Sequence, residues 1–224
     1  MEIASTFGWT AMRPGPGLLP ANELPGSYLQ IWDLSDRKHA RMRQRKDIAV
    51  PVASFPGVMG NALAEAGSHS TKPPRATGGN MDNKHLTVGS TLYLPIQVDG
   101  ALFSTGDAHA AQGDGECCVT AIETCSKLTL KFDLLSIKSI QEPQLRTSGP
   151  LCQSTNTAPY FATTAQGSDL YANAQQSIRY MIDHLIIERG LTWEEAYILC
   201  SVACLLYTSP SPRDLSTSRM PSSA

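Results

Sequence analysis

The spacing of apolar residues changes along this chain, and that change is the strongest constraint on its fold. Through most of the sequence, apolar residues occur in short runs, and residues 127–134 alternate polar and apolar with a period of two, as half-buried strands do. From residue 169 onward the apolar residues recur at helical spacing instead. The sequence therefore predicts an α+β fold that is mainly β, with a β-sandwich-like body followed by a late helix pair.

The expected strands are short and lie between breaks rich in Gly and Pro. They cover residues 28–34, 48–52, 87–98, 101–105, 127–134 and 160–164. Asp99-Gly100 is a tight-turn signal, so residues 87–98 and 101–105 are expected to pair as a hairpin. Residues 60–86 contain few apolar side chains and should form a long ordered loop, a type of segment that often carries function. The basic run at 37–46 is interpreted as a solvated loop or a strand edge.

The helix pair has clear boundaries in the sequence. Ser168 or Asp169 can cap a first helix over 169–189, and Gly190 supplies its end. Thr192 precedes Glu195 by three residues, a capping-box pattern that opens a second helix over 193–203. After residue 204 the helical pattern stops and Ser, Pro and Arg dominate. We therefore expect one partial domain over residues 1–204 and a non-native, disordered tail over 205–224.

Composition excludes several classes of protein. Of the 224 residues, 42% are hydrophobic and 17% charged, which is a globular composition. The formal net charge of −2 argues against nucleic acid as a partner, because phosphate binding needs a basic surface. No apolar stretch approaches a membrane span, and no signal peptide is visible, so we expect no membrane partner. The spacing of the six cysteines suits neither a disulfide scaffold nor zinc knuckles, which favours reduced thiols and a cytoplasmic location.

Two glycine-rich segments concentrate the polar residues that could carry chemistry. Asp107 and His109 are two residues apart, so an extended backbone places them on the same side. Upstream, Asp82 and His85 lie on a second glycine-loosened loop. Imidazole and carboxylate groups from the two segments could form a mixed nitrogen and oxygen site for a divalent metal. By spacing alone the signal is weak, because an Asp-x-His pair is more often a hydrogen-bonded turn.

Several runs in order resemble the acetamidase/formamidase family. They are residues 55–60 (FPGVMG), 77–86 (TGGNMDNKHL), 89–95 (GSTLYLP), 100–104 (GALFS) and 106–123 (GDAHAAQGDGECCVTAIE). The likeness extends from about residue 7 to residue 203. Ala108 and Cys117 depart from the family's usual residues, and Asn61-Ala62-Leu63 replaces a more typical Val-Ala-Pro. Family members are longer at both ends, so the resemblance implies a fragment truncated at both ends.

The resemblance implies a hydrolase that cleaves short linear amides, such as formamide and acetamide, to a carboxylate and ammonia, and it suggests a homo-oligomer. The expected metal ligands are Asp82, His85, Asp107 and His109. They would hold a divalent ion, expected to be zinc, whose bound water is acidic enough to supply hydroxide at neutral pH. Glu116 would act as general base and then protonate the leaving ammonia, with Asp107 and His109 at the catalytic centre. Asn80 and Gln112 could orient the substrate amide.

Two other hypotheses remain open from the sequence. Cys117 or Cys118 could be the nucleophile of a cysteine amidase, although their apolar surroundings favour packing. The chain could also be a binding module or an inactive fragment. Sensitivity to chelator or to a thiol alkylator separates the two enzyme hypotheses, and complete absence of ammonia release favours the third.

Overall fold

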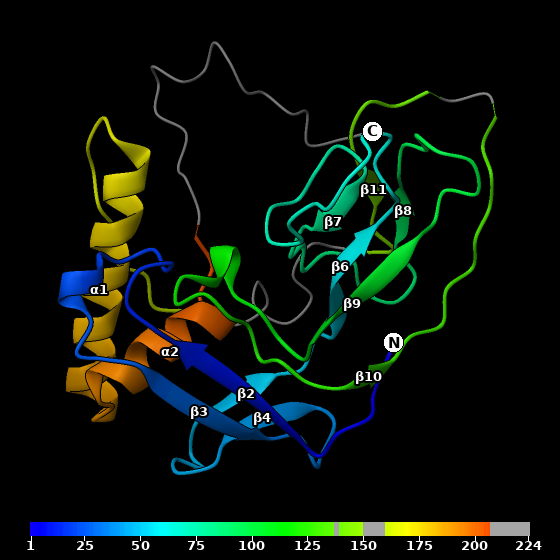
Figure 1. The fold of residues 1–224 in the computed structure, drawn as a ribbon. Helices are drawn as coiled ribbons and strands as arrows, with labels where there is room; N and C mark the ends of the chain where they lie inside the picture. The colour runs from blue at the N-terminus through cyan, green and yellow to red at the C-terminus, as the bar shows by residue number, and fades with distance from the viewer. Residues whose placement is uncertain (137–138, 150–159, 207–224) are drawn as a thin grey trace.

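The computed structural model describes residues 1–136, 139–149 and 160–206 (Figure 1). Nearly all of the expected tail, residues 207–224, lies outside the described residues. The strands are β1 (Glu2–Ile3), β2 (Phe7–Met12), β3 (Tyr28–Asp33), β4 (His39–Met42), β5 (Ala49–Pro51), β6 (Phe55–Gly60), β7 (Gly78–Asn80), β8 (Thr91–Tyr93), β9 (Ser104–His109), β10 (Ser126–Lys127) and β11 (Gln144–Arg146). The helices are the 3-10 turns η1 (Ala21–Glu23) and η2 (Asp114–Glu116), then α1 (Leu170–Arg189) and α2 (Trp193–Ala203). The mainly β fold with a late helix pair is confirmed.

Two sheets form most of the β structure. The larger has the order β2-β3-β4-β5, and a three-stranded sheet has the order β7-β6-β9, with every pair antiparallel. Two small ribbons, β1-β10 and β8-β11, complete the described strands. In Figure 1 the larger sheet lies at the bottom beside the two helices, and the strands β6 to β9 rise on the right.

A short extended segment, residues 121–124, joins the two sheets. On one side Glu123 exchanges backbone hydrogen bonds with Trp9 of β2, at 3.0 and 2.8 Å. On the other side Ala110 donates to Ile122 at 2.8 Å, and Glu123 also bridges His109 of β9. We call residues 121–124 the seam, because their backbone continues the hydrogen bonding from one sheet to the other.

Buried side chains fasten the seam to the larger sheet. The Trp32 indole donates to the Thr10 hydroxyl at 2.9 Å, and that hydroxyl donates to the Ala121 carbonyl at 2.7 Å. Trp32 and Thr10 are fully buried, so both polar groups need these partners. A continuous chain of bonds therefore runs from β3 through β2 into the seam.

The two helices begin and end where the sequence predicts. The Asp169 carboxylate accepts from the backbone N–H groups of Tyr171 and Ala172, and Gly190 ends α1 in the left-handed region at φ 59°. Thr192 and Glu195 form a complete capping box at the start of α2. The apolar faces of both helices join the larger sheet in one core. Neither helix is long and apolar enough to cross a membrane.

Several strand expectations are wrong in detail. The segments 87–98 and 101–105 do not form a hairpin, because β8 pairs with the distant β11 instead. Of the expected strand 127–134, only its first residue is in a strand, where β10 pairs with β1, and residues 160–164 form no strand. The basic run at 37–46 contains β4, an interior strand of the larger sheet whose Ala40 and Met42 are buried.

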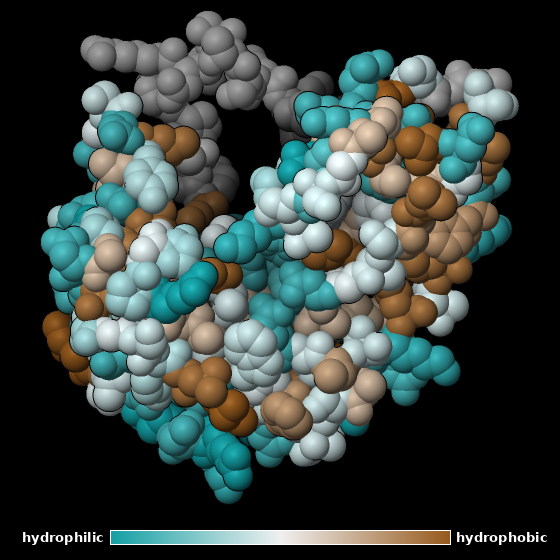
Figure 2. All heavy atoms as spheres, viewed as in Figure 1, coloured by the Kyte–Doolittle hydropathy of each residue, from teal (hydrophilic) through white to brown (hydrophobic). Residues whose placement is uncertain are grey.

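The part of the molecule that holds β8 and β9 leaves apolar side chains exposed. Figure 2 shows apolar residues gathered over this part, on the right. Among the described residues, Leu102 and Phe132 are both 67% exposed, and Phe103 contacts Phe132 edge to face. The main core lies elsewhere, between the larger sheet and the helices. The part of the molecule around β8 and β9 therefore buries less apolar surface than the part formed by the larger sheet and the helices.

Candidate functional site

The end of β9 presents Asp107 and His109 beside β6. In the antiparallel register Phe55 faces His109 and Val58 faces Gly106, so Gly57 lies next to Asp107. His109 is 1% exposed and packs edge to face against the Phe55 ring. The side chains of Asp107 and His109 approach each other as the two-residue spacing predicts, with 3.4 Å between Asp107 Oδ1 and His109 Nε2.

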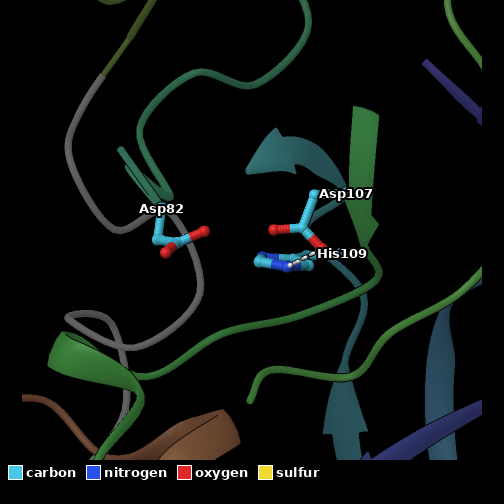
Figure 3. A group of neighbouring side chains, drawn as sticks. All are labelled: Asp82, Asp107 and His109. Atoms are coloured by element: carbon cyan, nitrogen blue, oxygen red, sulfur yellow. Dashed lines mark ion pairs between the residues drawn. The ribbon is translucent and has the colours of Figure 1, made fainter. Parts of the chain in front are cut away.

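Asp82 reaches the same point from the loop that follows β7. Its backbone N–H donates to the Gly57 carbonyl at 3.1 Å, which anchors the loop to β6. Figure 3 shows its carboxylate pointing across a gap toward Asp107 and His109. The two glycine-rich segments therefore fold toward each other as expected.

Two sets of potential ligand atoms share the His109 ring. Asp82, Asp107 and His109 form one group and His109, Glu116 and Glu123 the other, each with its ligand atoms within 4.8 Å of one another. From His109 Nε2 the distances are 3.2 Å to Glu123 Oε2 and 4.0 Å to Glu116 Oε1. Because both groups use the same ring, their donors surround a single location.

Three atoms at this location are buried without hydrogen bonds among the described residues. They are Asp82 Oδ1, His109 Nε2 and Glu116 Oε1. A buried polar atom without a partner is costly, so three of them side by side point to a bound group that satisfies them. Imidazole nitrogen with carboxylate oxygen is a donor set that suits a divalent metal ion, and the residues present therefore fit such an ion.

The electrostatics of the cluster favour added positive charge. Burial, followed by the charge of Asp82, raises the pKa of Glu116 to about 8. Burial also raises the pKa values of Asp82 and Glu123. Burial alone would lower the pKa of His109, but the acidic partners Asp107 and Glu123 outweigh it and raise that pKa to about 11. The neighbouring His109 in turn lowers the pKa of Asp107.

Three of the seven described non-glycine residues with positive φ belong to this cluster. Asp82, Asp107 and Glu116 all have positive φ, at 45°, 57° and 43°. Non-glycine residues rarely adopt this region, and each such residue costs about 1–3 kcal/mol unless surrounding structure enforces it. Three carboxyl residues strained in the same way around one location indicate that the fold is organised to aim these side chains.

Helix α2 fixes the segment that carries Glu116. The last carbonyls of α2 accept from the loop, Ser201 from the Gly113 N–H and Cys204 from the Asp114 N–H, both at 2.9 Å. The Ser201 hydroxyl accepts from the Cys118 N–H at 3.1 Å and donates to the Thr120 carbonyl at 2.8 Å. Glu116 thus lies on a short loop held at both ends by the helix.

The remaining expected site residues lie differently. His85 belongs to neither group of ligand atoms, and its backbone N–H donates to the Asn83 side chain at 3.1 Å. Asn80 donates its side-chain amide to the Lys72 carbonyl at 2.9 Å, in the outer loop. Gln112 contacts the site directly, with 2.9 Å between its Oε1 and His109 Nδ1. The roles expected for these three residues stay predictions.

The carboxylate of Glu123 is a site residue that the sequence reasoning did not single out. Its Oε1 accepts from the Ala121 N–H at 3.1 Å while Oε2 faces His109. Glu123 ends an apolar run, and a carboxylate at the end of such a run is the sequence feature that could have identified it as a site residue. Its importance comes from the seam, which depends on pairing with β2 more than a hundred residues earlier in the chain.

The two cysteines considered as nucleophiles, Cys117 and Cys118, lack the properties of one. Cys117 and Cys118 are 2% and 1% exposed, and burial raises the pKa of both thiols. Because the thiolate is the reactive form, these residues are inert packing groups at neutral pH. All five cysteines within the described residues are free, as expected for reduced thiols, and Cys152 lies outside them.

The chain is similar in sequence to known amide-hydrolysing proteins. A family model described as the Acetamidase/Formamidase family matches residues 61–207. An acetamidase of Mycolicibacterium smegmatis is 30% identical over 210 residues, which are 82% of this chain and 50% of that protein. A formamidase of Methylophilus methylotrophus is 37% identical over 134 residues, which are 55% of this chain and 32% of that protein.

A solved structure shares the fold. A gamma lactamase from Delftia acidovorans aligns with a TM-score of 0.72 at 22% identity, covering 89% of this chain and 63% of that one. This likeness shows a common architecture. The chain spans half the length of the acetamidase it matches and a third of the formamidase.

Proposed function

The chain belongs to the acetamidase/formamidase family, and from this premise we propose that it hydrolyses short linear amides to a carboxylate and ammonia. The observation that carries the proposal is the group of buried atoms without hydrogen bonds on Asp82, His109 and Glu116. Such a cluster provides both a place for a cation and a group that can move protons. The residues matched by the family model include this whole cluster.

Asp82, Asp107 and His109 would hold the cation, since their ligand atoms lie within 4.8 Å of one another. A divalent ion there would supply Lewis-acid chemistry, polarising the amide carbonyl and making water more acidic. We propose zinc, because zinc accepts the mixture of imidazole and carboxylate ligands found here. Asp107, which is 36% exposed, marks the side from which a small substrate reaches the cluster.

Glu116 would move the protons. Its Oε1 takes a proton from the attacking water as the oxygen bonds to the amide carbon. As the carbon–nitrogen bond breaks, Glu116 returns that proton to the nitrogen, and ammonia leaves. Burial raises the pKa of Glu116 to about 8, and a neighbouring cation lowers it from there, so this carboxyl can both accept and release a proton near neutral pH.

The test compares Glu116→Gln with the unaltered chain for ammonia release from formamide and acetamide and for bound metal. We expect the rate to fall by about 10²–10⁴-fold, the usual contribution of a general base, with metal content retained. Asp114→Asn is the control, because Asp114 pairs with Lys84 at 2.5 Å and lies outside the cluster.

Full activity of Glu116→Gln would contradict the proposed role. An unaltered chain that releases no ammonia with metal supplied would contradict the proposed activity, and inactivation by iodoacetamide rather than by chelator would favour the cysteine mechanism.

We also propose that the protein acts in the cytoplasm as a homo-oligomer. The free cysteines, of which Cys125 is exposed, suit a reducing compartment, since oxidising conditions would endanger an exposed thiol. The exposed apolar residues near β8 and β9 are compatible with contacts between copies of the chain. Sedimentation of the purified chain measures the oligomeric state directly, and a monomer at all concentrations would contradict this proposal.

A further inference from the structure

We propose that Gln112 is a positioning residue that selects the tautomer of His109 and ties the Asp82 loop to it. The inference rests on the proposed metal site, and it assigns Gln112 a role other than binding the substrate amide. The contacts that carry it are those at the two ends of one side chain. Gln112 Oε1 lies 2.9 Å from His109 Nδ1, and Gln112 Nε2 lies 2.6 Å from the Asp82 carbonyl oxygen.

The orientation of the Gln112 amide follows from its two partners. A backbone carbonyl oxygen can only accept a hydrogen bond, so the amide nitrogen must face Asp82. The amide oxygen then faces the His109 ring, and it can only accept. The hydrogen in that contact must therefore be on His109 Nδ1.

A hydrogen on Nδ1 decides which ring nitrogen is available to a metal ion. In a neutral imidazole one nitrogen carries hydrogen and the other offers a lone pair. When a metal ion takes up the ring, Nδ1 keeps its hydrogen for Gln112, so the lone pair is on Nε2, which is buried without a hydrogen bond and faces Asp107 and Glu123. Hydrogen bonds of this kind at the outer nitrogen fix ring orientation at metal sites and strengthen the ligand.

The backbone around Gln112 is rigid enough for this role. The preceding residue, Ala111, accepts from the Ile122 N–H at 3.0 Å, and the following Gly113 N–H donates to the Ser201 carbonyl at 2.9 Å. The backbone on either side of Gln112 is thus held by the seam and by helix α2. It connects the two ligand-bearing segments, which are otherwise separate in the sequence.

The test measures zinc affinity by competition with a chromophoric chelator, using Gln112→Met and Gln112→Glu. Methionine keeps similar length without hydrogen-bonding ends, and we expect zinc to bind about 10–100-fold more weakly. Glutamate keeps an acceptor for Nδ1 but cannot donate to Asp82, so it should restore part of the affinity. Gln97→Met is the control, since Gln97 Oε1 accepts from the Ala64 N–H in an unrelated loop, and its zinc affinity should match the unaltered chain.

Nitrogen NMR of the zinc-loaded protein provides the second readout. In the unaltered chain and in Gln112→Glu, the His109 hydrogen should be on Nδ1 and protected from solvent exchange. In Gln112→Met it should exchange rapidly, which a purely structural role would not produce. Zinc affinity of Gln112→Met equal to that of the unaltered chain would overturn this inference alone. An unaltered chain that binds no zinc would overturn the proposed metal site as well.

Discussion

A β-carbon at position 57 would fall among the donor groups of the site. It would lie 2.6 Å from Asp82 Oδ1, 2.8 Å from Asp107 Oδ2 and 2.8 Å from His109 Cε1, closer than carbon atoms approach such neighbours. Gly57 does not have a positive φ, so the absence of a side chain, and not backbone freedom, is what the site requires of it. The space that a cation would use is therefore kept open by this residue.

Gly57→Ala should consequently weaken zinc binding and slow ammonia release while the chain still folds. A displacement of about 1 Å at reacting groups costs on the order of 100-fold in rate, and we expect a loss of that size. Gly106→Ala is the matched control, because Gly106 lies on β9 and an added β-carbon there meets no atom within 4 Å. Equal zinc affinity in the two variants would show that position 57 does not shape the site.

At the scale of elements, the helices could be predicted in detail and the strands only in part. The ends of α1 and α2 depend on residues a few positions apart, such as Asp169 with Tyr171 and Thr192 with Glu195, so local sequence determines them. Pairing of β8 with β11 joins segments about fifty residues apart, and such a long-range pairing cannot be predicted from the local sequence of either strand. The proximity of Asp107 and His109 could be predicted because they are two residues apart on one strand. Glu123 reaches the site only through the pairing of the seam with distant strands, which the local sequence does not reveal.

The capping box of α2 gives a prediction for stability. Thr192→Ala removes the hydroxyl that accepts from the Glu195 N–H at 3.2 Å, and loss of such a cap costs about 1 kcal/mol. Urea denaturation should show that reduction in the free energy of unfolding. Thr192→Ser keeps the hydroxyl and should differ little from the unaltered chain. A loss as large in the serine variant would mean that packing of the threonine methyl group, and not the cap, provides the stability.

At the scale of the whole molecule, the cluster places several acidic groups in a buried region beside the apolar core. Repulsion among the carboxylates of Asp82, Glu116 and Glu123 destabilises the folded chain unless a cation balances their charge. A ligand that binds only the folded state adds about 2.7 kcal/mol at a concentration 100 times its dissociation constant. Zinc should therefore stabilise the protein as well as activate it.

Thermal unfolding with and without chelator checks this expectation. For a protein of this size, 1 kcal/mol shifts Tm by about 2–4 °C, so saturating zinc should raise Tm by roughly 5–10 °C. Asp82→Asn should lose most of the shift, because it removes a charged ligand from the cluster. A zinc-dependent rise that is undiminished in Asp82→Asn would place the stabilising ion elsewhere on the protein.

The seam has a mechanical consequence. The strip of backbone that joins the two sheets also supplies a carboxylate facing the imidazole, through Glu123. The paired backbones therefore hold the two sheets together at the point where the donor atoms of the site need constant separations. Rigidity of the framework and precision of the chemistry therefore meet at Glu123, whose backbone joins the sheets and whose side chain faces the imidazole.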